Sequence, residues 1–152
     1  MCKMIGLISD THGLMRPEAL TALKGSDLII HAGDVGKPEI LEELRALAPV
    51  VAVKGNVDTK AWASGLPDKA VAKSGSTSIY VLHDVHELDI DPAAARFDII
   101  VSGHSHRPGK IERSGVLYIN PGSAGPRRFR LPITVARLDL QQSPWGVEFI
   151  EL

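Results

Sequence analysis

The segment Ile5-Gly6-Leu7-Ile8-Ser9-Asp10-Thr11-His12-Gly13 changes character abruptly at Ser9. Its first four residues are mostly large and apolar, as in a strand that is buried on both faces. The residues that follow are polar and end in glycine, as in a tight loop. In α/β sheets, ligand sites form beyond the carboxyl ends of the strands. This segment therefore predicts an α/β fold with Asp10 and His12 at one edge of a sheet.

The same pattern of an apolar run followed by a polar loop recurs along the chain. The expected strands are Met4–Ile8, Leu28–His31, Val50–Val53, Ile79–Leu82, Ile99–Val101 and Val116–Ile119. A carboxylate, imidazole or amide follows each of them within a few residues. If these strands are parallel neighbours, the loops that follow them meet at a single edge.

The remaining segments predict helices and hairpins. We expect helices at Pro17–Leu23 and Lys37–Leu47, and a shorter one at Pro92–Phe97. Turn residues between apolar runs predict two hairpins, one that pairs 71–73 with 76–80 and one that pairs 110–113 with 116–119. A third hairpin is expected to pair 134–140 with 147–152 as two solvent-facing strands. Strands that alternate with helices and are followed by hairpins indicate two packed sheets flanked by helices.

Size and composition predict one soluble domain over residues 1–152. The 17 Lys and Arg nearly balance the 18 Asp and Glu, and this excludes a broad basic patch but not a local one. Cys2 is the single cysteine, so a disulfide framework and a cysteine-based zinc site are excluded. Without a leader pattern or a membrane span, the expected location is the cytoplasm.

Seven polar residues after five of the expected strands form a candidate metal site: Asp10, His12, Asp34, Asn56, His83, His104 and His106. Oxygen and nitrogen donors without a thiolate suit borderline-to-hard divalent cations. Seven donors are too many for one tetrahedral ion, whereas two ions bridged by a carboxylate use them all. A lone Asp-x-His is more often a turn with a capping aspartate, but the ordered set favours the metal site.

These motifs resemble those of the calcineurin-like metallophosphoesterase superfamily, and most closely its small phosphodiesterases of the YfcE type. The resemblance extends from Ile5-Gly6-Leu7-Ile8-Ser9-Asp10 to Asn120-Pro121-Gly122-Ser123. It implies a four-layer sandwich, in which two mixed β-sheets lie face to face with helices outside. It also implies a dinuclear site that hydrolyses phosphoesters through a metal-bridging hydroxide.

The resemblance assigns a role to each of the seven residues. Asp10, His12 and His106 match the ligands of the first metal. Asn56, His83 and His104 match the ligands of the second metal, and Asp34 matches the bridge. No further catalytic residue is implied.

Two positions depart from the family pattern. Many relatives carry a histidine after the asparagine of the third motif, where it protonates the leaving group, but Val57 stands there in this chain. The fourth motif is often His-Gly-His, but here it is His83-Asp84-Val85-His86. His86 is therefore displaced, and we interpret it as a loop residue with an auxiliary catalytic role as the alternative.

Several other polar residues have alternative interpretations. His31 is expected to be a hydrogen-bonded core histidine, or else a residue that supports a ligand. Asn120 and Ser123 are expected to hold the His104 loop. Asp58 either forms a turn or has an auxiliary role in which it orients a ligand or substrate water. The arginines Arg127, Arg128 and Arg130 are solvated or interfacial, with phosphate contacts as the alternative.

The leading hypothesis is thus a metal-dependent phosphodiesterase for small phosphoesters. A phosphomonoesterase on the same site and a non-catalytic interaction scaffold of the same fold, such as the retromer subunit, are the alternatives. Mn²⁺ is the expected metal by donor type, with Ni²⁺, Co²⁺, Zn²⁺, Fe²⁺ and Mg²⁺ as alternatives. A nuclease is disfavoured by the charge of −1 and the few aromatic residues, and the oligomeric state is left open.

Overall fold

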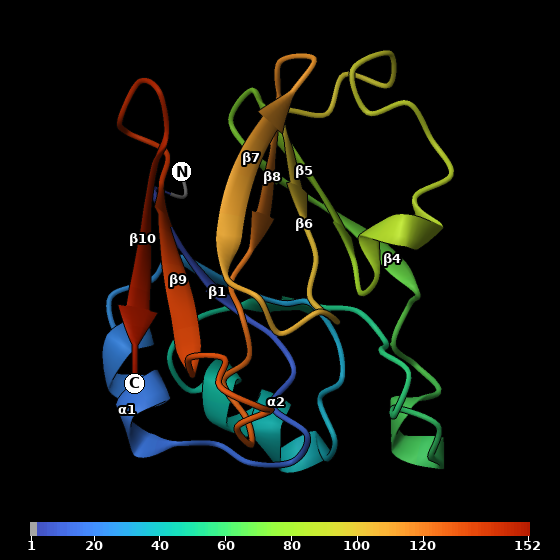
Figure 1. Ribbon diagram of the computed structural model, residues 1–152, viewed down its shortest axis with the longest axis vertical. Coiled ribbons are helices and arrows are strands. Elements are labelled where there is room, and N and C mark those ends of the chain that lie inside the picture. The colour runs from blue at the N-terminus through green and yellow to red at the C-terminus, as the bar shows by residue number, and fades with distance from the viewer. Residues whose placement is uncertain (1–2) are drawn as a thin grey trace.

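A computed structural model describes residues 3–152 of the chain, so Cys2 lies outside the described part (Figure 1). The first of its two sheets has the strand order β10-β9-β1-β2-β3. The parallel strands are β1 (Met4–Ile8), β2 (Leu28–His31) and β3 (Val50–Ala52). The antiparallel strands β9 (Thr134–Asp139) and β10 (Gly146–Glu151) extend the sheet beside β1.

The second sheet has the order β4-β5-β6-β8-β7. Its parallel strands are β5 (Thr77–Leu82), β6 (Ile99–Val101) and β8 (Val116–Asn120). The hairpin partners β4 (Lys69–Ser74) and β7 (Gly109–Arg113) form its two edges. The six expected strands thus divide into two sets of three parallel neighbours, one set in each sheet.

The main core lies between the two sheets. Apolar side chains from both sheets form one buried cluster, which includes Leu7 and Ile30 from the first sheet and Val81 and Ile99 from the second. Burial of this apolar surface is the main force that holds the sheets face to face.

Helices α1 (Pro17–Leu23) and α2 (Pro38–Arg45) cover the outer face of the first sheet. Each begins with a proline, whose fixed φ and missing N–H suit the first helical turn. Ile40, Leu41 and Leu44 of α2 pack into the cluster on this face, as the spacing of apolar residues predicts. The predicted α/β sandwich of two mixed sheets is therefore confirmed.

The outer face of the second sheet differs from the sequence prediction. The helix expected at Pro92–Phe97 is wrong, because this segment forms only turns, and Arg96 adopts a left-handed φ of 65°. The segment between β5 and β6 instead contains a short 3₁₀-helix, η2 (Val85–Glu87). Leu88 and Phe97 of this segment pack on the sheet and bury Leu82 and Ile100.

The final hairpin is also less exposed than its alternating pattern indicates. Strand β9 lies between β1 and β10, and Val135, Ala136 and Leu138 are fully buried. The prediction of two solvent-facing strands is therefore wrong for β9, because both faces of the first sheet are covered. Another short 3₁₀-helix, η1 (Ala61–Ala63), follows β3, and no helix of residues 3–152 is long and apolar enough to cross a bilayer.

Candidate metal centre

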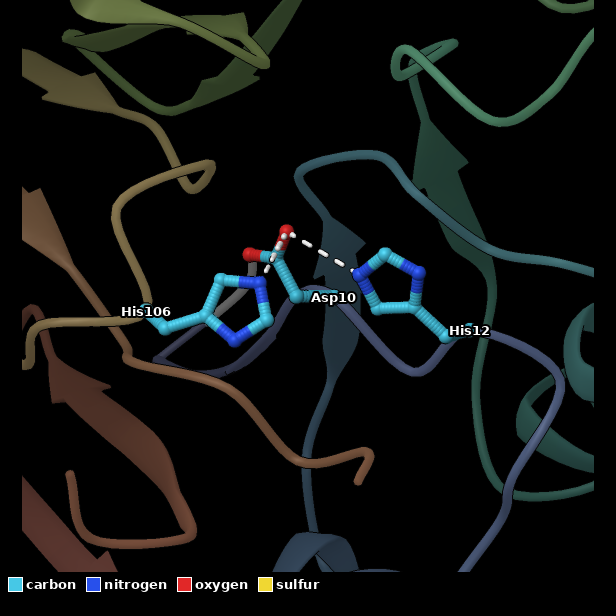
Figure 2. A group of neighbouring side chains, drawn as sticks. All are labelled: Asp10, His12 and His106. Atoms are coloured by element: carbon cyan, nitrogen blue, oxygen red, sulfur yellow. Dashed lines mark ion pairs between the residues drawn. The ribbon is translucent and has the colours of Figure 1, made fainter. Parts of the chain in front are cut away.

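The loops that follow the parallel strands of both sheets meet at one edge. Figure 2 shows Asp10 and His12 from the loop after β1 together with His106 from the loop after β6. These three side chains form one group whose ligand atoms lie within 4.8 Å of one another. Asp10, Asp34 and His83 form a second such group. The two groups share Asp10, so the structure brings five of the seven predicted donors into one cluster.

The two carboxylate oxygens of Asp10 have different surroundings. Oδ2 accepts hydrogen bonds from the Ser9 hydroxyl at 2.7 Å and from the backbone N–H of His104 at 3.1 Å. Oδ1 is buried and has no hydrogen-bond partner among the described residues. It lies 3.4 Å from Nε2 of His106 and 3.9 Å from Nε2 of His12, the two ion pairs drawn in Figure 2. It is also 3.9 Å from Nε2 of His83. Such an orphaned oxygen among imidazoles fits a bound cation.

The two carboxylate oxygens of Asp34 also have different contacts, as in Asp10. Oδ1 accepts a hydrogen bond of 3.0 Å from the backbone N–H of Val57. Oδ2 lies 3.1 Å from Nε2 of His83 and 3.5 Å from Nε2 of His12. One oxygen is thus held by the backbone, and the other lies between histidines from the two groups.

A backbone hydrogen bond fixes the orientation of the His83 ring. Its Nδ1–H donates a 2.8 Å hydrogen bond to the carbonyl of Ala32, which leaves Nε2 to face Asp34. A backbone carbonyl that accepts from the second ring nitrogen is the usual support for a metal-binding histidine.

His104 and Asn56 lie on the solvent side of His83. Nδ1 of His104 is 3.3 Å from Nε2 of His83, and its Nε2 is 3.8 Å from Oδ2 of Asp84. Asn56 is exposed and lines a hollow of about 140 Å³ together with His83 and Asp84. Both residues are therefore near the cluster but less enclosed than the other five.

Burial and neighbouring charges alter the pKa values in the cluster. Burial raises the pKa of Asp10 to about 6, against the Ser9 hydrogen bond. Burial also opposes ionisation of Asp34, but hydrogen bonds from His83 and Val57 lower its pKa overall. The same carboxylate raises the pKa of His83 despite the burial of the ring. Burial, with the nearby charge of Arg128, lowers the pKa of His106 to about 4.

Backbone strain is concentrated at this edge. Five of the eight non-glycine residues of 3–152 with positive φ belong to the predicted donor set: Asp10 (56°), His12 (47°), Asp34 (55°), His104 (71°) and His106 (62°). Left-handed backbone conformations are unfavourable for residues other than glycine, and such conformations cluster at functional sites. Close packing accompanies them, because a Cβ at Gly55 would collide with the backbone and side chain of Asp34.

His31 supports the cluster without joining it. Its Nδ1 accepts a 3.1 Å hydrogen bond from the N–H of Gly33, so the neutral ring carries its proton on Nε2. Nε2 lies 3.0 Å from Oγ1 of Thr11, which donates to the carbonyl of Val35. Burial lowers the pKa of His31 to about 4 and keeps the ring neutral. His31 therefore connects the loops after β1 and β2 as a hydrogen-bonded core histidine.

Asn120 and Ser123 hold two different loops. The amide of Asn120 donates 3.0 Å hydrogen bonds to the carbonyl of Gly103 and the hydroxyl of Ser105, and so holds the His104 loop. The Ser123 hydroxyl instead donates to the carbonyl of Asp10 at 3.1 Å. The expectation that Ser123 holds the His104 loop is thus wrong, because the return of the chain places Ser123 beside β1.

Asp58 is buried, and its carboxylate accepts hydrogen bonds of about 3 Å from three backbone N–H groups, those of Val35, Gly36 and Gly55. These contacts match the interpretation of Asp58 as a turn-forming residue, because backbone N–H groups occupy both of its carboxylate oxygens. Asp58 connects the loop that carries Asp34 to the loop that carries Asn56.

The remaining sequence candidates lie at the surface. The side chain of His86 is 87% exposed and contacts Asp84 through Nδ1 at 3.0 Å. Arg127 and Arg128 are exposed on the segment after Ser123. Ser9 was missed by sequence reasoning, although its position directly before Asp10 in the polar loop is the available signal.

The fold and the donor cluster define an α/β sandwich with a candidate site for divalent cations. The family model described as the calcineurin-like phosphoesterase superfamily domain matches residues 4–143. The chain belongs to this superfamily, and the family is metal-dependent.

Curated relatives are similar over most of the chain. A probable metallophosphoesterase of Methanothermobacter thermautotrophicus is 35% identical over 149 residues, which cover 90% of this chain and 86% of the relative. The phosphodiesterase MJ0936 of Methanocaldococcus jannaschii is 24% identical over 93% of this chain and 95% of its own length.

Solved structures share the fold. Vps29 of Chaetomium thermophilum superposes with a TM-score of 0.79 at 20% identity and covers 97% of each chain. The phosphoesterase YfcE of E. coli superposes with a TM-score of 0.69 at 22% identity, over 90% of this chain and 88% of YfcE. At these identities the likeness shows the fold alone.

Proposed function

We propose that the protein is a phosphodiesterase that binds two divalent cations and hydrolyses small phosphoesters. The observation that carries this proposal is the buried Oδ1 of Asp10, which has no hydrogen-bond partner within residues 3–152 and lies among three histidines. Asp34 adds a second negative charge beside two of these histidines, His12 and His83. Two carboxylates and several imidazoles at one edge are a suitable environment for two cations.

The first donor group coincides with the predicted ligands of one cation, and the second contains Asp34 and His83 together with Asp10. Asp10, His12 and His106 would hold one cation. Asn56, His83 and His104 would hold the other, with Asp34 between the two sets. Bound divalent cations activate water and neutralise charge on a phosphoester as Lewis acids. Because no sulfur donor is present in the set, Mn²⁺ is the proposed metal.

The chain itself keeps the donors in place. The Ser9 hydroxyl and the His104 N–H hold Oδ2 of Asp10, while the Val57 N–H holds Oδ1 of Asp34. Each carboxylate therefore presents its other oxygen toward the histidines without a further change of conformation. Such preorganisation reduces the cost of arranging charges during reaction.

The relative from Methanocaldococcus jannaschii is a phosphodiesterase by name, and this similarity supports a diester over a monoester as the substrate. Val57 occupies the position of a proton donor in many relatives, and its side chain is 46% exposed. This site therefore suits esters whose leaving group departs without a protein-borne proton.

Metal analysis combined with kinetics tests the proposal. Purified protein is loaded with Mn²⁺, Ni²⁺, Co²⁺, Zn²⁺ or Mg²⁺, and hydrolysis of bis(p-nitrophenyl) phosphate is compared with that of p-nitrophenyl phosphate. We expect two cations per chain and a higher kcat/KM for the diester. His83→Ala should lose a cation and activity, whereas the exposed His86→Ala serves as the matched control and should retain both.

The alternative functions correspond to other outcomes of the same experiment. A higher kcat/KM for the monoester would identify a phosphomonoesterase and contradict the diesterase proposal. Absence of turnover with two bound cations would favour a non-catalytic interaction module, for which the 88% exposed Phe129 is the supporting observation. One cation per fully loaded chain would contradict the dinuclear site.

A further inference from the structure

A cationic and aromatic surface lies beside the donor cluster. It is formed by Arg107, Arg127, Arg128, Phe129, Arg130 and Leu131, and we call it the Phe129 surface. Four of these residues, Arg107, Phe129, Arg130 and Leu131, line an open hollow of about 670 Å³. This volume is within the range of small-molecule sites and far exceeds that of a phosphoryl group.

Phe129 has an unusual position for a large apolar side chain. It is 88% exposed, and its φ of 55° is left-handed. A hydrogen bond of 3.2 Å from the N–H of Leu131 to the carbonyl of Arg128 closes the turn that presents it. The exposed ring gains little from packing here, and strained backbone conformations cluster at functional sites.

The base of this turn is attached to the donor cluster. The Ala124 N–H donates to the carbonyl of Ser9 at 3.0 Å, and the Ser123 hydroxyl donates to the carbonyl of Asp10. Nη2 of Arg16 donates to the carbonyl of Gly125 at 3.3 Å. These bonds hold the segment against the loop that carries Asp10, so the Phe129 surface and the donor cluster have a defined relative position.

The guanidinium groups of the Phe129 surface carry uncompensated charge. No ion pair joins them to a carboxylate within residues 3–152. Glu112 is the single acidic residue between positions 104 and 133. Arg107 follows His106 directly, and the charge of Arg128 contributes to the lowered pKa of His106. The near-neutral net charge of the chain therefore conceals a local positive surface beside the cluster.

We propose that the Phe129 surface binds the nucleoside part of a nucleotide-containing phosphodiester, such as a dinucleotide, while the scissile phosphoryl group lies at the donor cluster. This inference rests on the proposed hydrolase function and specifies its substrate class. A base stacks on the ring of Phe129, as bases do on exposed aromatic residues of single-strand-binding proteins. The arginines contact the other phosphate oxygens, because planar guanidinium groups match their geometry.

The kinetic test uses two diesters with the same leaving group, p-nitrophenyl thymidine 5′-phosphate and methyl p-nitrophenyl phosphate. The measured quantity is the ratio of their kcat/KM values, which cancels effects on the shared chemistry. We expect a ratio well above one in the parent. Phe129→Ala should lower it on the order of tenfold, the effect of losing one stacked base. Arg130→Gln should raise the KM for the nucleotide.

Matched controls come from two other elements, β4 and α2. Val71→Ala removes another exposed apolar side chain, and Arg45→Gln removes an exposed arginine at the end of α2. Both should leave the ratio unchanged. If both diesters are hydrolysed and the ratio of their kcat/KM values is the same in the parent and in Phe129→Ala, the proposal is overturned.

A binding measurement separates this proposal from the hydrolase proposal. Fluorescence anisotropy of a labelled tetrathymidylate is followed with protein stripped of metal, so that no hydrolysis occurs. Binding that weakens on the order of tenfold in Phe129→Ala supports the surface even if no diester is ever hydrolysed. Absence of oligonucleotide binding, or Phe129-dependent binding to anionic vesicles alone, would contradict it.

Discussion

Oδ1 of Asp10 lies 3.4 Å from Nε2 of His106 and has no hydrogen-bond partner in the described part of the chain, although both side chains are buried. The two residues come from different sheets, after β1 and β6. Burial raises the pKa of Asp10 and lowers that of His106, so each ionised form is disfavoured. A cation between them would remove this penalty, because both groups could bind it in their deprotonated forms.

Substitution of Asp34 should affect both proposed cations. Asp34→Asn keeps an acceptor for the Val57 N–H but removes the charge beside His12 and His83. We expect it to reduce kcat by at least 100-fold and to lower the occupancy of both metal positions. His106→Ala should mainly reduce one. Metal stoichiometry and single-turnover kinetics measure both effects, and near-normal turnover by folded Asp34→Asn would show that the carboxylate is not shared.

Metal removal should destabilise the protein. Without a cation, the buried carboxylates of Asp10 and Asp34 repel each other. A metal that binds only the folded state stabilises it by about 2.7 kcal/mol at a hundredfold excess over Kd. For a domain of this size, EDTA should therefore lower the Tm by roughly 5–10 °C. Calorimetry with and without chelator measures the shift, and an unchanged Tm after demonstrated loss of metal would argue against the site.

His31 should make the metal-free protein sensitive to acid. The folded ring has a pKa of about 4, whereas an unfolded histidine titrates near 6.5. Between these values the unfolded state binds more protons, so stability is complete above about pH 6.5 and falls as the pH decreases toward 4. The loss from this one residue amounts to about 3 kcal/mol at most.

Urea unfolding in EDTA at several pH values checks this prediction. His31→Gln should lose less stability than the parent between pH 6.5 and 4.5, whatever its stability at neutral pH. His86→Gln, which replaces an exposed histidine, is the control. Parallel curves for the parent and His31→Gln would contradict a proton-linked role for His31.

Val57 should make catalysis depend on the leaving group. A positioned general acid contributes about 10²–10⁴-fold, and valine has no proton to donate. Aryl diesters should therefore react readily and alkyl diesters poorly, with a steep dependence of rate on leaving-group pKa. Val57→His should flatten this dependence if the ring reaches the leaving oxygen, since the exposed position has room for it. A flat dependence in the parent would reveal another proton donor, and a steepening on His86→Ala would identify it.

Local patterns predicted the strands and the polar loops after them. The runs at Met4–Ile8, Leu28–His31 and Ile99–Val101 appear with the expected bounds, because continuous apolar segments bounded by turn residues have few other conformations. The segment Pro92–Phe97 shows the limit of this approach. Its alanines favour a helix, but a single turn has too few hydrogen bonds to propagate, and Leu88 and Phe97 pack onto the second sheet instead.

The donor types and their order along the chain were already present in the sequence, since Asp10, Asp34 and His83 each lie within three residues of the end of a strand. Tertiary structure alone decided that β1–β3 and β5, β6 and β8 lie in different sheets, so that Asp10 faces His106 across them. It also decided that the Ser123 hydroxyl bonds to the Asp10 carbonyl and that Phe129 is exposed on the turn that follows. These relations depend on contacts between residues about 100 positions apart, whereas periodicity and turn chemistry report only on neighbours along the chain.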